Sequence, residues 1–304
     1  MTRNQIMKQL KGVFPPLVTP FNRRGDVDLG LYRENVQRYM GIGLSGVVIA
    51  GSTGEAPFLT ERERLQLLDV ARKIVRPPDI VITSTGLEST LLTLRLSREA
   101  VARGSDALLV ITPNYFKARM DSATLQGHFR AVADGVRRPV IMYNIPQFTG
   151  IRMAPETIAA LARHPNIAAL KESSGDLGYV RKIIRRVGPG FRVLVGSPLI
   201  FLQALQAGAV GGILGQADFV PELCLAIYDA FLKRRLKLGR DLQQRLVFLA
   251  QSIAVPHGIP GVKAAVDLCG YHGGPPRAPL MPLTSAQHRA IADALRTALR
   301  GLVA

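Results

Sequence analysis

The sequence predicts an α/β protein, a (β/α)8 TIM barrel followed by a C-terminal helical extension. Short runs of β-branched and apolar residues alternate with longer amphipathic stretches, which is the pattern of a parallel sheet covered by helices. Eight such runs precede residue 218, and only helical patterns follow it. With 304 residues and 47% hydrophobic content, the chain can bury one large core. We therefore expect a barrel over residues 1–217 and a helical extension packed on it over 218–304.

The expected strands are short runs rich in Val, Ile, Leu and Ala. In chain order they cover residues 13–19, 46–50, 80–84, 107–111, 139–143, 167–171, 193–195 and 211–214. Because the connections between them are long enough for helices, consecutive strands are expected to pair in parallel. Eight such β/α units close into a barrel.

The segments between the strands carry apolar residues at helical spacing. They predict helices over residues 29–40, 60–75, 90–103, 122–135, 155–163 and 176–186. Thr60 and Glu63 have the spacing of a capping box, which marks the start of the second of these helices. Beyond residue 218 we expect three or four helices, a loop over 273–279 rich in Gly and Pro, and no further strand.

Reactive side chains lie at the ends of five predicted strands. In a (β/α)8 barrel the active site forms at the C-terminal ends of the strands. These ends read Gly51-Ser-Thr-Gly-Glu55, Thr112-Pro-Asn-Tyr115, Tyr143-Asn-Ile-Pro146, Lys171-Glu-Ser173 and Gly196-Ser197. Their convergence around one lysine predicts an active site at this end of the barrel.

Lys171 ends the apolar run Ile167-Ala-Ala-Leu-Lys171. Burial among these side chains removes water from the ammonium group and favours the neutral amine, which is a nucleophile toward carbonyl carbon. The alternative is a lysine at a strand end that extends its amine into solvent. The neighbouring polar strand ends favour the catalytic interpretation. Glu172, one residue on, is expected to face the helices instead.

A lysine that forms a Schiff base needs a group that donates and accepts protons. The phenol of Tyr143 on the neighbouring strand is suitable. The turn 51–54 offers backbone N–H groups and the hydroxyls of Ser52 and Thr53, which suit a carboxylate. The alternatives are a tyrosine that caps the core and a turn that only connects a strand to a helix. Placed opposite Lys171, the two features indicate a site for a 2-oxo acid.

The net charge of +17 and the pI near 10.6 raise the possibility of a nucleic-acid partner. The basic residues, however, are scattered over helical segments, and aromatic residues make up only 6% of the chain. We therefore expect no nucleic-acid partner. Such a charge can instead attract small anionic substrates over long range.

Several other classes of site are not expected. No Gly-x-Gly-x-x-Gly follows a predicted strand, no Walker loop occurs, and the five histidines lack metal-ligand spacing, so we expect neither a metal nor a cofactor. Cys224 and Cys269 lie in apolar helical patterns, which predict free thiols. No apolar run approaches the roughly 18 residues needed to cross a membrane, and the first residues lack the apolar centre of a secretion signal. A cytoplasmic protein without a membrane partner is expected.

The chain resembles the family of dihydrodipicolinate synthases and N-acetylneuraminate lyases, which are Schiff-base-forming pyruvate aldolases. The resemblance spans nearly the whole chain and rests on Gly12-Val-Phe-Pro-Pro-Leu-Val-Thr-Pro-Phe21, the turn 51–54, Tyr143-Asn-Ile-Pro146, Lys171 and Gly258-Ile-Pro-Gly261. It implies that Lys171 binds pyruvate as an imine and that Tyr143 transfers protons.

The resemblance also implies roles for other residues. Ser52 and Thr53 would bind the carboxylate and relay protons, and Tyr115 would enter the site of a neighbouring subunit. The backbone of Ile213 would lie near the bound pyruvate, and Gly196 is expected to line the substrate site. The implied assembly is a homotetramer, a dimer of dimers, whose other partner is a small-molecule substrate.

The choice of substrate depends on a departure from the synthase pattern. Synthases usually carry an arginine after Tyr-Asn-x-Pro that binds the aldehyde's carboxylate, but here the loop reads Gln147-Phe148-Thr149-Gly150. Similarity to 4-hydroxy-2-oxoglutarate aldolases lies in residues 57–60, Arg119-Met120, 258–263 and 270–279, and in Ser173, which would meet a second carboxylate. Those aldolases commonly have Asn where this chain has Thr53.

We therefore expect cleavage of 4-hydroxy-2-oxoglutarate-like acids to pyruvate and an aldehyde such as glyoxylate. The alternatives are a dihydrodipicolinate synthase that condenses pyruvate with aspartate semialdehyde, and a barrel that binds 2-oxo acids without turnover. Arg119 or Lys117 is a further candidate for the second carboxylate.

Overall fold

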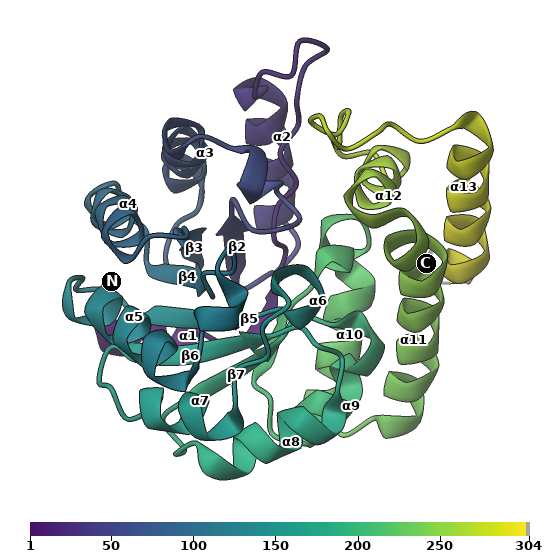
Figure 1. Cartoon of the computed structure of the whole chain (residues 1–304). Coiled ribbons are helices and arrows are strands. Elements are labelled where there is room, and N and C mark those ends of the chain that lie inside the picture. The colour runs from purple at the N-terminus through teal and green to yellow at the C-terminus, as the bar shows by residue number, and fades with distance from the viewer. Residues whose placement is uncertain (302–304) are drawn as a thin grey trace.

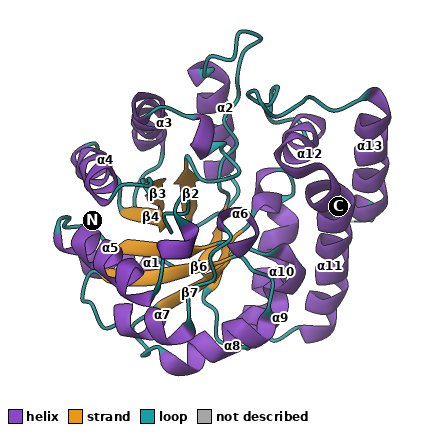
Figure 2. Cartoon of the chain, in the orientation of Figure 1, coloured by secondary structure: helices purple, strands orange, loops and turns teal. Residues whose placement is uncertain are grey.

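Eight parallel strands form the centre of the molecule and helices surround them (Figures 1 and 2). The computed structural model describes residues 1–301. The strands are β1 Gly12–Phe14, β2 Gly46–Ile49, β3 Ile80–Ser84, β4 Ala107–Ile111, β5 Val140–Asn144, β6 Ile167–Glu172, β7 Arg192–Val195 and β8 Gly211–Ile213. Each strand from β2 to β7 pairs with the next one in the chain, and β8 pairs with β1. The predicted (β/α)8 barrel is confirmed.

Closure between β1 and β2 uses few backbone bonds. Pro16 and Val48 form an isolated parallel bridge, in which Leu17 N–H donates to the Val48 carbonyl at 3.0 Å and Val48 N–H donates to the Pro15 carbonyl at 3.0 Å. The strand predicted over 13–19 is therefore wrong beyond Phe14. Pro15 and Pro16 have no N–H to donate to a ladder, which ends the regular strand early.

The helices follow the predicted order. Their bounds are α1 Arg3–Gln9, α2 Leu29–Met40, α3 Glu61–Ile74, α4 Thr90–Ala102, α5 Ser122–Asp134, α6 Pro146–Thr149, α7 Pro155–Leu161, α8 Leu177–Arg186, α9 Phe201–Gln206, α10 Pro221–Leu232, α11 Leu236–Leu249, α12 Val255–Leu268 and α13 Ser285–Leu299. The capping box of Thr60 and Glu63 at the start of α3 is confirmed. Three short helices were not predicted, namely α1, α6 and α9.

Apolar side chains form two buried clusters, one inside the barrel and one between the strands and the helices. Phe14, Val48 and Leu109 belong to the inner cluster. Ile6 of α1 and Leu10 just after it join the same cluster, so α1 covers the N-terminal end of the barrel. The other end, where the polar strand ends lie, is left for a site.

The last four helices form the extended C-terminal part. Helix α10 follows β8 and contacts β1, and α11, α12 and α13 pack on one another beside it (Figure 1). Helix α12 is kinked at Gly258, whose φ of 56° is the left-handed conformation that glycine adopts freely. No helix within residues 1–301 has the length and apolar character that a membrane span requires.

Candidate active site

Lys171 lies inside the barrel, near the end of β6. Its register partners are Tyr143 on β5 and Leu194 on β7, so it shares the inner face of the sheet with Tyr143. Only 3% of Lys171 is exposed, and its Nζ lies 4.1 Å from the centre of the Tyr143 ring. The alternative of a lysine extended into solvent is therefore wrong. The structure places a buried primary amine against a phenol.

Tyr143 connects the lysine to the turn after β2. Its hydroxyl lies 3.4 Å from the Oγ of Ser52, and either oxygen can donate the bond. Thr53 lies toward the end of β8, because a Cβ placed on Gly215 would be 3.5 Å from the Thr53 Oγ1. The phenol and the two hydroxyls of the turn thus lie over the same end of the barrel as Lys171.

Gly196 lets the Ser173 hydroxyl lie close to its backbone, beside the lysine. A Cβ at this position would overlap the Oγ of Ser173 and lie 3.1 Å from the Cε of Lys171. The Ser173 hydroxyl is buried and has no hydrogen-bond partner among the described residues. It therefore has an unused hydrogen-bond donor close to Lys171.

Ile213 ends β8 and belongs to the same inner cluster as Tyr143. It brings the backbone at the end of β8 to the rim of the site. The structure thus brings together one amine, one phenol, three hydroxyls and two residues that shape the space, namely Lys171, Tyr143, Ser52, Thr53, Ser173, Gly196 and Ile213.

Tyr115 and Phe148 are not gathered into this group within one chain. Tyr115 is 78% exposed, and its ring packs edge-on against the exposed Phe116 at 5.0 Å between ring centres. Its backbone N–H donates to the Glu88 carboxylate at 2.8 Å, which fixes the loop but leaves the ring in solvent. Phe148 is 63% exposed on α6.

The loop around α6 borders the site and lies against a cation from the segment after β4. Gln147 Nε2 donates to the Ser173 carbonyl at 2.8 Å, which ties α6 to the end of β6. Lys117 lies against Gly150, because a Cβ at this glycine would be 3.3 Å from the Lys117 Cδ and 3.8 Å from its Nζ. The amine of Lys117 is therefore held beside the residue that follows α6.

Glu172 faces away from Lys171, as its position on the strand predicted. Its Oε1 accepts from Asn144 Nδ2 at 3.1 Å and from Ser174 N–H at 2.8 Å. Burial raises the pKa of Glu172 above its usual value, and these two hydrogen bonds oppose the rise. Asn144 was not singled out in the sequence, although it directly follows Tyr143. The hydrogen bond between Asn144 and Glu172 joins the ends of β5 and β6.

Asp218 is a buried acid that sequence reasoning missed. Neither carboxyl oxygen has a hydrogen-bond partner among the described residues. Burial raises the pKa of Asp218 well above its usual value, and the nearby backbone N–H of Val18 and the charge of Lys171 act in the opposite direction. The only sequence signal was an acidic residue in the apolar stretch after the last strand.

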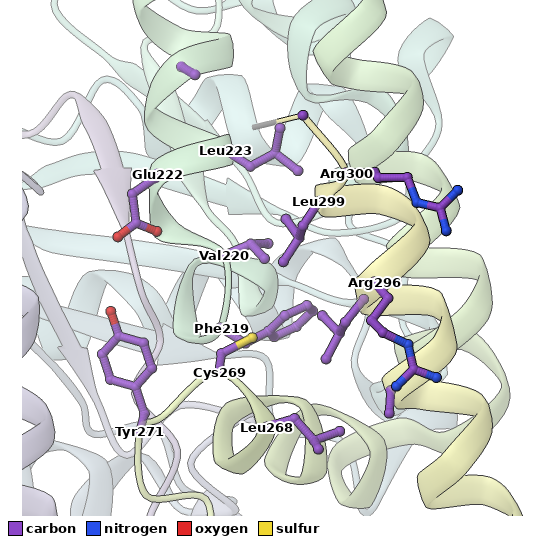
Figure 3. Close-up of a pocket in the computed structure, with 14 residues that line it drawn as sticks. Phe219, Val220, Glu222, Leu223, Leu268, Cys269, Tyr271, Arg296, Leu299 and Arg300 are labelled. Atoms are coloured by element: carbon purple, nitrogen blue, oxygen red, sulfur yellow. The ribbon is translucent and has the colours of Figure 1, made fainter. Parts of the chain in front are cut away.

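A large cavity lies elsewhere. Its volume is about 1030 Å³, and it is lined by the C-terminal helices α10, α12 and α13, with Phe219, Leu223 and Leu299 among its apolar residues (Figure 3). None of the strand-end residues lines it. Cys269 borders this cavity, and both Cys269 and Cys224 are free thiols, as predicted. Among residues 1–301, no three His, Cys, Asp or Glu side chains are grouped as metal ligands would be.

The chain is similar to known proteins over nearly its whole length. The model of the Dihydrodipicolinate synthetase family matches residues 9–298. A 4-hydroxy-tetrahydrodipicolinate synthase of Synechococcus sp. (strain CC9311) is 36% identical over 286 residues, which cover 93% of each chain. A probable mitochondrial 4-hydroxy-2-oxoglutarate aldolase of Emericella nidulans is 33% identical over 288 residues, again 93% of each chain.

A solved structure has the same architecture. The crystal structure of YagE in complex with pyruvate, a prophage protein from E. coli that belongs to the dihydrodipicolinic acid synthase family, matches with a TM-score of 0.90 at 27% identity. The match covers 95% of this chain and 98% of that chain.

Proposed function

Because the chain belongs to the Dihydrodipicolinate synthetase family, a family of lyases, we propose that it cleaves 4-hydroxy-2-oxoglutarate-like acids to pyruvate and an aldehyde such as glyoxylate. One observation carries the proposal. The buried amine of Lys171 lies 4.1 Å from the centre of the Tyr143 ring. An amine kept from water beside a proton donor is the arrangement that imine chemistry needs.

In this proposal the neutral amine of Lys171 attacks the keto carbon and a protonated imine forms as water leaves. Tyr143 donates the proton that lets the hydroxyl leave as water, and its phenolate then removes the proton from the substrate's 4-hydroxyl group. The adjacent carbon–carbon bond breaks, its electron pair passes to the imine nitrogen, and the aldehyde departs. The enamine then takes this proton from the Tyr143 phenol at its terminal carbon, and water hydrolyses the imine to release pyruvate and the free lysine.

We assign the substrate's two carboxylates to opposite sides of the site. Ser52 and Thr53, with the N–H groups of the turn 51–54, would hold the carboxylate next to the keto group. Ser173 would meet the second carboxylate, because its buried hydroxyl has no partner within residues 1–301. We assign the amine of Lys117 to the same carboxylate, since it lies beside Gly150.

Phe148 sets the choice between cleavage and synthase activity. An arginine at its position would pair with a carboxylate through charge-assisted hydrogen bonds, and a phenylalanine cannot. We expect the kcat/KM for cleavage of 4-hydroxy-2-oxoglutarate to exceed that for condensation of pyruvate with aspartate semialdehyde by at least about tenfold. Both reactions are measured on one purified sample.

The second candidate function is that condensation, which the 36% identity to a named synthase favours. Faster condensation than cleavage in the paired assay would establish it and overturn the aldolase proposal. A third possibility is a barrel that binds 2-oxo acids without turnover. Such a protein would form the imine and show neither reaction.

We also propose a homotetramer built as a dimer of dimers, in which Tyr115 completes the site of a partner subunit. The exposure of Tyr115 and Phe116 supports this assembly, because two large aromatic side chains on one loop favour burial against another surface. We further propose a cytoplasmic protein whose other partners are small molecules, and a boundary between the barrel and the helical extension at residues 217 and 218.

A further inference from the structure

A buried ion pair joins the C-terminal helices to the turn after β2. Lys263 on α12 donates from Nζ to Glu55 Oε1 at 2.7 Å, although 208 positions separate the two residues. Lys263 is 1% exposed and the Glu55 side chain is fully buried. A buried pair of charges is stable only if its remaining hydrogen-bonding capacity is also used.

Every donor of Lys263 has a partner. Its Nζ also donates to the Thr19 carbonyl at 2.8 Å and to the Pro275 carbonyl at 2.7 Å. The second oxygen of Glu55 accepts the backbone N–H of Arg277 at 2.8 Å. The pair therefore connects three separate segments, those after β1, after β2 and after α12.

Glu55 directly follows the turn 51–54 and has a left-handed backbone with φ of 59°. Its N–H donates to the Ser52 carbonyl at 3.1 Å, which closes the turn. A non-glycine residue keeps this conformation only when its surroundings hold it. Here the carboxylate is held by Lys263 and the backbone N–H of Arg277.

Thr19 fixes the same turn from the other side. Its Oγ1 donates to the Gly54 carbonyl at 2.7 Å, and its own carbonyl accepts from Lys263. Gly54 lies close against the neighbouring backbone, because a Cβ there would be 2.7 Å from the Leu17 carbonyl oxygen. Lys263 thus holds the turn in two ways. It bonds directly to Glu55, and it bonds to Thr19, whose hydroxyl holds Gly54.

We propose that Lys263 is a positioning residue for the carboxylate of the 2-oxo acid, because through Glu55 it fixes the turn that presents Ser52 and Thr53. The inference rests on the proposed function, in which this turn binds the carboxylate. Lys263 does not touch the substrate. Its loss should weaken recognition of the carboxylate and leave the chemistry of Lys171 largely intact.

The test compares pyruvate with methyl pyruvate, whose ester carries no charge. The readout is the ketone concentration that gives half-maximal borohydride trapping on Lys171, measured by mass. In Lys263→Met we expect this concentration to rise about tenfold or more for pyruvate, from the loss of charge-assisted contacts. For methyl pyruvate it should change less than about twofold, because the ester lacks the anion that those contacts recognise.

The double variant Glu55→Gln/Lys263→Met separates positioning from folding. Lys263→Met alone leaves an unpaired carboxylate in the interior, whereas the double variant removes both charges. We expect the double variant to recover much of the lost Tm and to keep the pyruvate-specific defect. If Lys263→Met does not fold, this variant alone carries the test.

Arg72→Met is the matched control. Arg72 pairs with the buried Asp106 at 2.7 Å just before β4, at the opposite end of the barrel. This variant should lower Tm without changing the preference for pyruvate over methyl pyruvate.

An unchanged preference in the folded variants of Lys263, or an equal loss for both ketones, would overturn the inference. Failure of the wild-type protein to trap pyruvate would instead overturn the proposed function, and the inference with it.

Discussion

Lys171 is the residue on which the chemistry depends, since a buried amine beside a phenol can form an imine. We expect pyruvate and borohydride to add the mass of a reduced pyruvate imine to the peptide that contains Lys171. Lys171→Ala should abolish turnover, while its circular dichroism stays that of the wild type, because the change only shortens one side chain at the end of β6. Peptide mass spectrometry checks the label, and a label on any other lysine would contradict the assignment.

Gly196 shapes the space next to that amine. Gly196→Ala should lower kcat/KM about tenfold or more, because the new methyl group overlaps the Ser173 Oγ and crowds the Lys171 Cε at 3.1 Å. Removing the overlapping oxygen in Gly196→Ala/Ser173→Ala should relieve the crowding only in part.

The matched control is Gly127→Ala on α5, where nothing lies within 4 Å of the added Cβ. This change should leave the kinetics unaltered and raise stability slightly, because alanine favours a helix over glycine. Equal kinetics in both alanine variants would show that the space beside Lys171 is not used by the substrate.

At the scale of elements, the loop after β4 is expected to act across an interface. If Tyr115 serves the partner's site, a mixture of inactive Lys171→Ala and impaired Tyr115→Phe subunits should regain activity on re-assembly. In a mixed dimer one site then has both Lys171 and Tyr115, each from a different chain. The assay is turnover after unfolding and refolding the mixed chains.

Each variant refolded alone is the control for that experiment. No gain in the mixture, or an active monomer by light scattering, would place Tyr115 within its own subunit and contradict the tetramer.

The strands and long helices could be predicted because their signals are local. The runs over 80–84 and 107–111 match β3 and β4 residue for residue, and the pattern over 29–40 matches α2. The short helix α6 was missed because four residues show no periodicity. The early end of β1 was missed because Pro15 and Pro16 interrupt an apolar run that otherwise has strand composition.

The candidate site also has a part that the sequence could predict and a part that it could not. Residues at or just after strand ends, such as Lys171 and Ser173, could be found because the barrel itself brings strand ends together. The pairing of Lys263 with Glu55 could not, because it depends on how α12 packs against a turn formed 208 positions earlier. The available signal was a lysine between Val262 and Ala264, in an apolar stretch of helix.

For the whole molecule, Asp218 should make stability depend on pH. Its folded-state pKa is raised, so its contribution is favourable below the unfolded value of about 3.9 and is lost as pH rises toward the folded value. The charged and titratable groups that act on it or feel its charge come from several elements, namely Lys171, Tyr32, Tyr39, Tyr271 and Cys224. Asp218→Asn should therefore have a higher Tm than the wild type, and the difference in Tm should be larger at pH 8 than at pH 5.

Thermal unfolding across that range checks the prediction. Glu63 does not interfere, because its bond with Arg277 holds its pKa at about 2 and its contribution is lost only as pH falls below about 4.5. Glu172 is present in both proteins and cancels. The exposed Asp241, changed to Asn, is the control and should show no such trend. A gain for Asp218→Asn that is the same at every pH would contradict the prediction.

The sparse closure between β1 and β2 has a consequence for how the chain reaches its native state. Thr19 follows β1 and Glu55 follows β2. Lys263 bonds to both, so α12 connects the two segments across the sparsely bonded contact that closes the barrel. During synthesis the first two strands leave the ribosome long before residue 263. The segments after these two strands therefore lack their bonds to Lys263 until nearly the whole chain has been made. In Lys263→Met we expect faster hydrogen exchange of the Leu17 and Val48 amides, because the bonds that these amides make between the two segments would open more often.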